Sequence, residues 1–387
     1  MKAKCDIILL SYESPELLKE CVKSVLEKTN VNSRLIIVDN ASRDPEVARY
    51  LREVHGNDTV QIEKVFSERN AGFAGGMNKG IRLSDAPYVC LLNNDCVVTN
   101  GWLREMINIA KSRKDIGLVN PQSNTFGSKP REGVSLEKHA ETLSGRKGKF
   151  VELGHAIGFA CLVKREVIDK IGYLDEAYEG VCYEDTDFSV RAQKVGYIAV
   201  AAEGSYVFHH EQSSRKGLKG KEMIYKKNRE LFEKRWGKLL RVFFFADSSV
   251  SMTNGGILEY YENLKDLARQ RVFIDLWIEK DETDRNLFLE KDFKPEVSHA
   301  DIGVYLFVNK WMFLSVLWRV LTKKKKYDAV ILKEGRLAAF LRFLRPIHRA
   351  QLFTFDEGTR LHDQKGERFD LKDPLALAGH LRKIKKK

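Results

Sequence analysis

Residues 88–98, YVCLLNNDCVV, join a short apolar run to the polar triplet Asn93, Asn94 and Asp95. The run predicts a buried β-strand, and the triplet marks the carboxyl end of that strand. Ligands of parallel α/β sheets gather at the carboxyl ends of the strands. Magnesium and manganese prefer oxygen ligands and share them with phosphates, so we expect Asp95 to bind such a cation. The alternative for an isolated Asn-Asn-Asp triplet is a polar turn that caps the strand.

The same order of strand, polar end and helix occurs earlier in the chain. Apolar residues 6–10 predict a strand, and Ser14 and Pro15 then predict a helix cap with a proline in the first turn. Apolar residues 34–38 predict a second strand, which ends at Asp39. Short apolar strands that alternate with helices are typical of a mostly parallel sheet covered on both faces. We therefore predict the α/β class.

A chain of 387 residues has room for two domains. A new apolar strand, residues 240–245, follows Trp236 and Gly237, and we place the boundary near residue 238. The predicted domains are residues 1–238 and a smaller, Rossmann-like α/β domain at 239–387 with a basic tail. Residues 121–149 are rich in Ser, Gly, Lys and Arg without periodicity, and we expect a long surface loop there.

Charge and cysteine content narrow the class of protein. The formal net charge of +12 suits an anionic partner such as a nucleotide, a nucleic acid or an acidic membrane surface. No nucleic-acid-binding motif accompanies the charge, so we expect no nucleic acid partner. The six cysteines form no CxxC pair and indicate neither a zinc site nor a disulfide framework. Reduced thiols and a start that resembles a buried strand favour a cytoplasmic protein.

A cluster of acidic residues opens a predicted amphipathic helix. Glu184, Asp185 and Asp187 fall in its first turn, where the helix dipole stabilises carboxylates by about 0.3 to 1 kcal/mol each. Capping alone is therefore a serious alternative, although three acids exceed what capping needs. Crowded carboxylates raise one another's pKa, which suits one of them to act as a general base. We assign that role to Asp185.

Two further motifs carry ligand-type residues. An apolar run delivers His209 and His210, which can coordinate manganese-like cations or contact phosphate. The residues alone leave open which of His209 and His210 would be the metal ligand. The glycine-rich stretch at residues 70–78 permits close backbone approach and opens a predicted helix. It follows at least two strands, which disfavours a Rossmann oxidoreductase, where such glycines follow the first strand.

Taken together, the motifs resemble the family 2 glycosyltransferases of the GT-A fold, in particular the rhamnosyltransferase-like members, over residues 4–237. The motifs occur in the expected order, as DIILLSYES, LIIVDNASRD, ERNAGFAGGMNKGI, YVCLLNNDCVV, GHAIGFACLVKREVIDKIGYLDE, YEDTDFSVRAQKVGY and VFHHEQSS. Asn93 departs from the aspartate that usually opens the family's metal motif. The resemblance implies a sugar transferase that inverts the anomeric centre, with Mn2+ or Mg2+ as cofactor.

The resemblance also implies a role for individual residues. Asp185, with Glu184 beside it, would be catalytic, and Asp95 and His209 would bind the metal. Gly158 and Phe159 match the acceptor-side wall, and their alternative is an ordinary buried strand. The residues on the side of the nucleotide-sugar donor would be Tyr12, Asp39, Asn70, Gly72, Asn78, Asn93 and Asn94.

The expected reaction moves a sugar from a nucleotide diphosphate, such as dTDP-rhamnose or a UDP-sugar, to a hydroxyl of a glycan or lipid-linked glycan in polysaccharide biosynthesis. Two other functions remain open. A nucleotidyltransferase would share the sheet and the metal-binding acids but would release pyrophosphate from a triphosphate. A non-catalytic nucleotide- or glycan-binding module would bind the same ligand without turnover.

The second half of the chain is less informative. Gly255 and Gly256 before a predicted helix are similar to the start of the N-terminal, acceptor-binding half of GT-B glycosyltransferases. Residues 302–321 are markedly apolar and precede four lysines at 323–326, which resembles an interfacial helix beside a polybasic patch. Peripheral contact with a membrane is therefore one expectation. The alternative, a core strand and helix with a solvated run of charge, is favoured about twofold.

Overall fold

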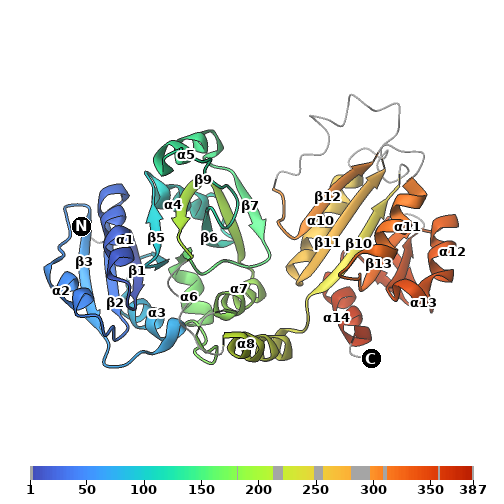
Figure 1. The fold of residues 1–387 in the computed structure, drawn as a ribbon. Helices are drawn as coiled ribbons and strands as arrows, with labels where there is room; N and C mark the ends of the chain where they lie inside the picture. Colours follow the sequence, from blue (N-terminus) through green and yellow to red (C-terminus); the bar gives the residue numbers. More distant parts are fainter. Residues whose placement is uncertain are drawn as a thin grey trace. The chain divides into compact units, whose positions relative to one another are not determined.

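A computed structural model describes residues 3–180, 182–211, 221–247, 256–279, 297–307, 312–355 and 358–385 (Figure 1). The chain forms two compact units, Met1–Arg235 and Trp236–Lys387, and each is described here by itself. Gly255, one of the two glycines that suggested a GT-B half, lies outside the described residues. Both units are built from a central sheet with helices, which confirms the predicted α/β class.

The first unit contains a nine-stranded sheet whose main path runs β3-β2-β1-β4-β8-β6-β9-β5, with β7 beside β9. The first four strands of this path are mutually parallel, and so are β6 and β9, whereas β5, β7 and β8 run antiparallel to their neighbours. The strands are β1 (Cys5–Ser11), β2 (Ser33–Asp39), β3 (Val60–Phe66), β4 (Tyr88–Asn93), β5 (Cys96–Val98), β6 (Ile116–Gln122), β7 (Phe150–Leu153), β8 (Ala160–Lys164) and β9 (Ile198–His209).

Helices cover both faces of this sheet, because successive side chains of a buried strand point to opposite faces. One core joins Ile7 and Leu9 to α1, α2 and α4, and the other joins Ile8 and Leu10 to α3, α6 and α7. The helices are α1 (Pro15–Lys28), α2 (Pro45–Glu53), α3 (Gly72–Leu83), α4 (Trp102–Ser112), α5 (Leu136–Thr142), α6 (Arg165–Ile171), α7 (Glu184–Lys194), α8 (Lys221–Trp236) and the short η1 (Ser144–Arg146).

The register of the central strands brings their polar ends to one edge of the sheet. Ser11 at the end of β1 pairs with Asp39 of β2, and Leu10 pairs with Asn93 of β4. Strand order reverses between β1 and β4, since β2 lies on one side of β1 and the later β4 on the other. Such a reversal opens a crevice at the carboxyl ends of the strands, where α/β proteins bind ligands.

The glycines of α3 allow that helix to lie close to β1. A Cβ atom added at Gly80 would stand 2.3 Å from Cγ2 of Ile8 and 3.3 Å from Cγ2 of Val38. Gly80 lies just beyond the glycine-rich stretch at residues 70–78, and within that stretch a Cβ atom added at Gly76 would stand 2.4 Å from Cδ1 of Leu10. Gly72, at the start of α3, instead has a φ of +72°, which favours glycine.

We expect Gly80→Ala to destabilise the first unit. Alanine in a helix is normally favoured over glycine, but here its methyl group would clash with the branched side chain of Ile8, at a cost of about 1–3 kcal/mol. Gly145→Ala is the matched control, because no atom lies within 4 Å of its added Cβ. Urea unfolding of the full chain, followed by circular dichroism, measures both. Equal stability of the two variants would contradict this account of the packing.

The second unit has a seven-stranded sheet in the order β12-β11-β10-β13-β14-β15-β16, parallel as far as β14 and antiparallel beyond it. Helices α10 and α14 pack on one face, and α11 and α12 on the other. The strands are β10 (Leu240–Ala246), β11 (Val272–Glu279), β12 (Ile302–Phe307), β13 (Ala329–Lys333), β14 (Gln351–Phe355), β15 (Arg360–Asp363) and β16 (Arg368–Asp370). The helices are α10 (Gly256–Arg269), α11 (Met312–Thr322), α12 (Arg336–Phe343), α13 (Arg345–His348) and α14 (Pro374–Lys385).

Two local expectations were wrong. Pro15 does begin α1, but Ser14 makes no side-chain cap and has a φ of 56°. Residues 121–149 are not one loop, since Ser135 caps α5 through Lys138 N. Residues 302–321 contain a strand and a helix, which is the alternative that was favoured over one interfacial helix. Across the ranges given above, the helices are all too short or too polar to cross a bilayer.

Candidate active site

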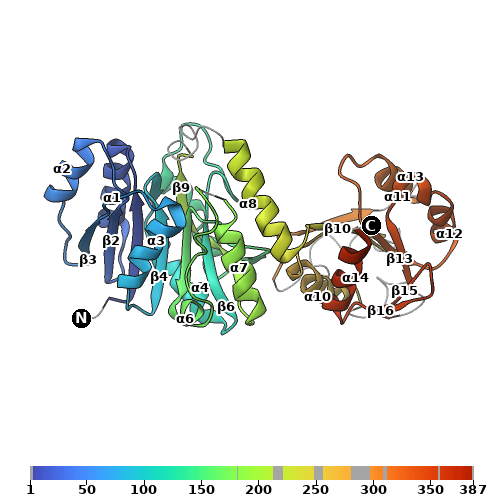
Figure 2. The ribbon, with the colours of Figure 1, turned by 90° about the horizontal axis from the view of Figure 1, so that it is seen from below.

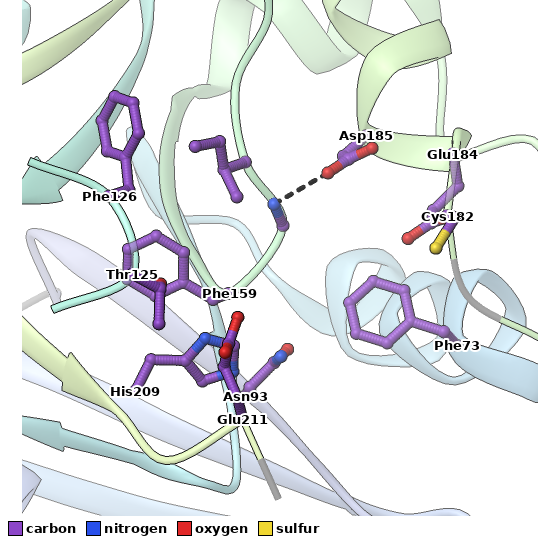
Figure 3. Close-up of a pocket in the computed structure, with 12 residues that line it drawn as sticks. Phe73, Asn93, Thr125, Phe126, Phe159, Cys182, Glu184, Asp185, His209 and Glu211 are labelled. Carbon is purple, nitrogen blue, oxygen red and sulfur yellow. Dashed lines mark hydrogen bonds between the residues drawn. The ribbon is translucent and has the colours of Figure 1, made fainter. Parts of the chain in front are cut away.

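A cavity of about 240 Å³ opens at the carboxyl edge of the first sheet (Figure 3). Three predicted site segments meet in it, although they lie far apart in the chain: the end of β4, the start of α7 and the end of β9. The lining residues are Phe73, Asn93, Thr125, Phe126, Ile157, Gly158, Phe159, Cys182, Glu184, Asp185, His209 and Glu211.

Asp95 and His209 lie side by side next to this cavity. Strand β5 pairs antiparallel with the end of β9, and this pairing sets Cys96 opposite His209. His209 Nε2 is 3.2 Å from Asp95 Oδ1, and the Asp95 side chain is only 1% exposed. The imidazole also stacks on Phe159, with ring centroids 5.2 Å apart, which fixes its orientation. His209 lines the cavity and Asp95 lies behind it.

The neighbouring His210 points elsewhere. Its Nε2 lies 3.1 Å from Glu20 Oε2, and its ring packs edge-on against Phe208. Alternation along an extended strand explains why two adjacent imidazoles face different surroundings. Of the two histidines, His209 is therefore the one beside Asp95.

The residues around Asp95 suit a hard divalent cation. The imidazole nitrogen of His209 and the carboxylate of Asp95 are ligands that manganese accepts. Asn93 Oδ1 adds a buried carbonyl oxygen for which the described residues supply no hydrogen-bond partner. The Cys96 thiol also lies within ligand distance of this pair, but burial raises its pKa well above the ordinary value. A protonated thiol is a poor metal ligand, so the site offers oxygen and nitrogen.

Asp185 occupies the opposite wall of the cavity, at the start of α7. Its Oδ2 accepts a hydrogen bond from the Gly158 N–H at 2.9 Å, drawn as the dashed line in Figure 3, and its Oδ1 accepts one from Thr186 N at 2.6 Å. A Cβ atom on residue 158 would stand 3.4 Å from Asp185 Oδ2. Gly158 thus lets the loop approach the carboxylate closely.

The perturbed carboxyl group of the acidic cluster is Glu184. Burial, and then the charge of Asp185, raises the pKa of Glu184 from 4.5 to about 8. The side chain is 5% exposed, and none of the described residues hydrogen-bonds its Oε2. The raised pKa thus belongs to the neighbour of the residue that sequence reasoning assigned as the base, Asp185. Glu184 is therefore mostly protonated at neutral pH.

We expect Glu184→Gln to flatten the pH dependence of stability. The unfolded chain releases the Glu184 proton near pH 4.5, while the folded protein keeps it until about pH 8. Folding stability of the wild type therefore falls through this window, by about 1.4 kcal/mol per pH unit from this one group. Urea unfolding at several pH values measures the difference. A wild-type and a Gln curve that run parallel from pH 5 to pH 8 would contradict the raised pKa.

The residues assigned to the donor are distributed along the same sheet edge, but only Asn93 lines the described cavity. Tyr12 follows β1 and is 42% exposed. Asp39 ends β2, and its Oδ1 accepts a hydrogen bond from Ser42 Oγ at 2.6 Å. Asn70 Oδ1 accepts one from Asn40 Nδ2 at 2.9 Å.

Three other residues assigned to the donor have local roles. Asn78 is buried, and its amide bonds the backbone of Leu174 in both directions and Glu176 Oε1 at 2.8 Å. It therefore fastens α3 to the loop before α7 and does not line the cavity. Gly72 begins α3, where its backbone carbonyl accepts a hydrogen bond from Asn40. Asn94 is 8% exposed and lies in the turn between β4 and β5.

Sequence reasoning missed several lining residues. Thr125 and Phe126 come from the segment predicted to be a long surface loop, of a kind often tied to binding, in which no single residue was chosen; backbone hydrogen bonds between Ser123 and Phe126 form a tight turn there. Phe73 and Glu211 were never singled out, although each lies within a motif quoted above. Their position beside predicted ligand-binding residues could have identified them, because neighbouring side chains often line the same cavity.

A mostly parallel α/β sheet thus has an acid-lined cavity at its carboxyl edge, beside a carboxylate and an imidazole, where α/β proteins bind ligands. Residues 6–172 match the family model described as glycosyl transferase family 2, which supports a glycosyltransferase. The match ends before the second unit, whose resemblance to a GT-B half stays a prediction.

The chain is also similar to individual proteins. Over 206 residues the chain is 25% identical to the low-salt glycan biosynthesis hexosyltransferase Agl10 of Haloferax volcanii, which covers 49% of this chain and 61% of that protein. An uncharacterized Sinorhizobium fredii protein, y4gI, is 26% identical over 60% of this chain and 27% of its own length. The chain thus spans less than two thirds of both relatives. A solved mannosyltransferase from Pyrobaculum calidifontis, in complex with GDP-Man and Mn2+, has 17% identity and a TM-score of 0.46, over 61% of this chain and 64% of that one.

Proposed function

We propose that the first unit is an inverting, divalent-metal-dependent glycosyltransferase that moves a sugar from a nucleotide diphosphate to an acceptor hydroxyl. The observation that carries this proposal is that one cavity is lined by four of the predicted site residues. Asp185 and Glu184 lie on one of its walls, and His209 and Asn93 lie on the other. A base and a diphosphate-binding group on opposite walls suit a direct displacement at a sugar carbon held between them.

In this proposal Asp185 accepts the proton of the acceptor hydroxyl. The acceptor oxygen forms a bond to the anomeric carbon as the bond from that carbon to the diphosphate oxygen breaks. The nucleoside diphosphate leaves, and the anomeric centre is inverted in one step. Glu184, held protonated by its raised pKa of about 8, is a hydrogen-bond donor and not a competing base.

Asp95 and His209 would hold the cation, with Asn93 Oδ1 as a further oxygen close to them. When bound, a divalent cation supplies positive charge that stabilises the departing diphosphate. A carboxylate, an imidazole and an amide oxygen are ligands that suit manganese or magnesium.

The proposed acceptor is a glycan or a lipid-linked glycan, and the donor is dTDP-rhamnose or a UDP-sugar. The names of the relatives support the acceptor class, since the Haloferax volcanii protein is a hexosyltransferase of glycan biosynthesis and AmsB of Erwinia amylovora is an amylovoran biosynthesis glycosyltransferase. AmsB is 28% identical over 206 residues, half of this chain.

Product analysis tests this function against a nucleotidyltransferase. The full chain is incubated with Mn2+, a nucleotide sugar and, separately, the nucleoside triphosphate with a sugar phosphate. The proposal predicts nucleoside diphosphate from the first mixture and no pyrophosphate from the second. Pyrophosphate release would assign the cavity to nucleotidyl transfer. Donor binding by calorimetry without any product, even with a panel of glycan acceptors, would assign it to a binding module.

A further inference from the structure

The second unit exposes large apolar side chains on three helices that lie together in both views (Figure 1 and Figure 2). Trp318 is 72% exposed and Phe343 is 78% exposed, far more than such side chains usually are. We call this set of residues the α11–α13 face. Its apolar members are Phe313, Leu314, Trp318, Phe340, Phe343 and Ile347.

The face is continuous and is not a by-product of loose packing. Phe313 of α11 and Phe340 of α12 touch, with ring centroids 5.8 Å apart, so the two helices share one surface. The inward sides of the same helices are fully packed, with Val316, Val320 and Leu341 at 0–1% exposure. These helices therefore already bury one apolar side in the core and present a second one outward. Contiguous exposed apolar surface marks an interaction site.

The surroundings of the face are strongly basic. Residues 312–350 contain ten lysines and arginines but only two acidic residues. Asp275 from β11 holds two of the cations, Arg319 and Lys323, on the inner side. Several others are exposed around the apolar residues: Lys324, Lys325, Arg336, Arg345 and Arg349.

We propose that the α11–α13 face binds the surface of an anionic lipid bilayer. Tryptophan, phenylalanine and leucine insert at the boundary between headgroups and acyl chains, and lysines and arginines around them bind anionic headgroups at about 1 kcal/mol each. The apolar residues of this face match the acyl-chain boundary of such a bilayer, and its basic residues match the anionic headgroups. A second copy of the chain is a poor occupant, because a symmetric contact would oppose two basic surfaces.

This binding site differs from the interfacial helix expected from residues 302–321. Only α11 of that stretch contributes, since β12 is a strand of the sheet, and half of the six apolar residues of the face come from α12 and α13. The proposal does not depend on the transferase proposal, because lipid binding is measured without a donor.

Vesicle flotation of the full chain tests the proposal. We expect binding to vesicles of phosphatidylcholine with phosphatidylglycerol, little binding to phosphatidylcholine alone, and weakening as salt rises from about 0.1 M to about 0.5 M. Lys324→Glu with Lys325→Glu should reduce binding at least about tenfold. Trp318→Ser with Phe343→Ser should do the same through lost apolar area. Leu375→Ser is the control, since Leu375 of α14 is 68% exposed but outside the face.

Three results would overturn the proposal. The first is absence of wild-type binding to anionic vesicles. The second is equal binding to neutral and anionic vesicles, which would remove the role of the basic residues. The third is a dimer, seen by light scattering, that Trp318→Ser with Phe343→Ser dissociates, because the face would then be an interface between copies of this chain.

Discussion

Asp185→Asn is expected to reduce glycosyl transfer by about 100-fold to 10,000-fold, the range for loss of a general base. Asparagine keeps an oxygen that can accept the Gly158 N–H bond but cannot take a proton from the acceptor hydroxyl. Donor affinity, measured by calorimetry, should change by less than about threefold, because the base acts on the acceptor. Steady-state release of nucleoside diphosphate measures the turnover.

The matched control is Asp169→Asn, an exposed aspartate of α6 away from the cavity. It should retain wild-type turnover and wild-type unfolding. Turnover of Asp185→Asn within twofold of this control would remove Asp185 from the chemistry. Loss of donor binding together with turnover would instead place Asp185 on the donor side.

The second large effect is expected for His209→Asn, with His210→Asn as its neighbour and control. His209 Nε2 lies 3.2 Å from Asp95 Oδ1, whereas His210 bonds Glu20, half-exposed on α1. Loss of one metal ligand weakens the charge stabilisation of the leaving group, and a loss of about 3 kcal/mol is about 100-fold in rate. His209→Asn should also raise the Mn2+ concentration needed for half-maximal turnover. His210→Asn should do neither.

The opposite pattern, with His210→Asn inactive and His209→Asn active, would show that the end of β9 adopts the other register when the cation is bound. Equal activity of both variants would remove the imidazoles from metal binding. Thermal unfolding of each variant separates these outcomes from misfolding, since His209 also stacks on Phe159.

Much of the fold could be predicted because the strands of a parallel sheet are short, apolar and end in polar residues. The strands predicted at residues 34–38 and 88–92 agree with β2 and β4 to within one residue at each end. The acids at 184–187 correctly marked the first turn of α7. Antiparallel β8 and β5 were not predicted, because pairing between distant strands leaves no local pattern.

The site could be predicted in its parts but not in its arrangement. That His209 and not His210 faces Asp95 depends on the pairing of β5 with β9, which no single segment encodes. The raised pKa of Glu184 depends on burial beneath surrounding loops, so the sequence suggested the acid cluster but not which member is perturbed. Asn78 was assigned to the donor by its motif, whereas its amide bonds the distant backbone of Leu174.

The most direct test of the account is the release of nucleoside diphosphate by the full chain from a panel of nucleotide sugars. The protein is first stripped with a chelator and then given Mn2+, since slow hydrolysis can report without an acceptor. The account predicts release from one donor that stops with the chelator and returns with the metal. No release from any donor, together with no donor binding by calorimetry in the presence of Mn2+, would contradict it.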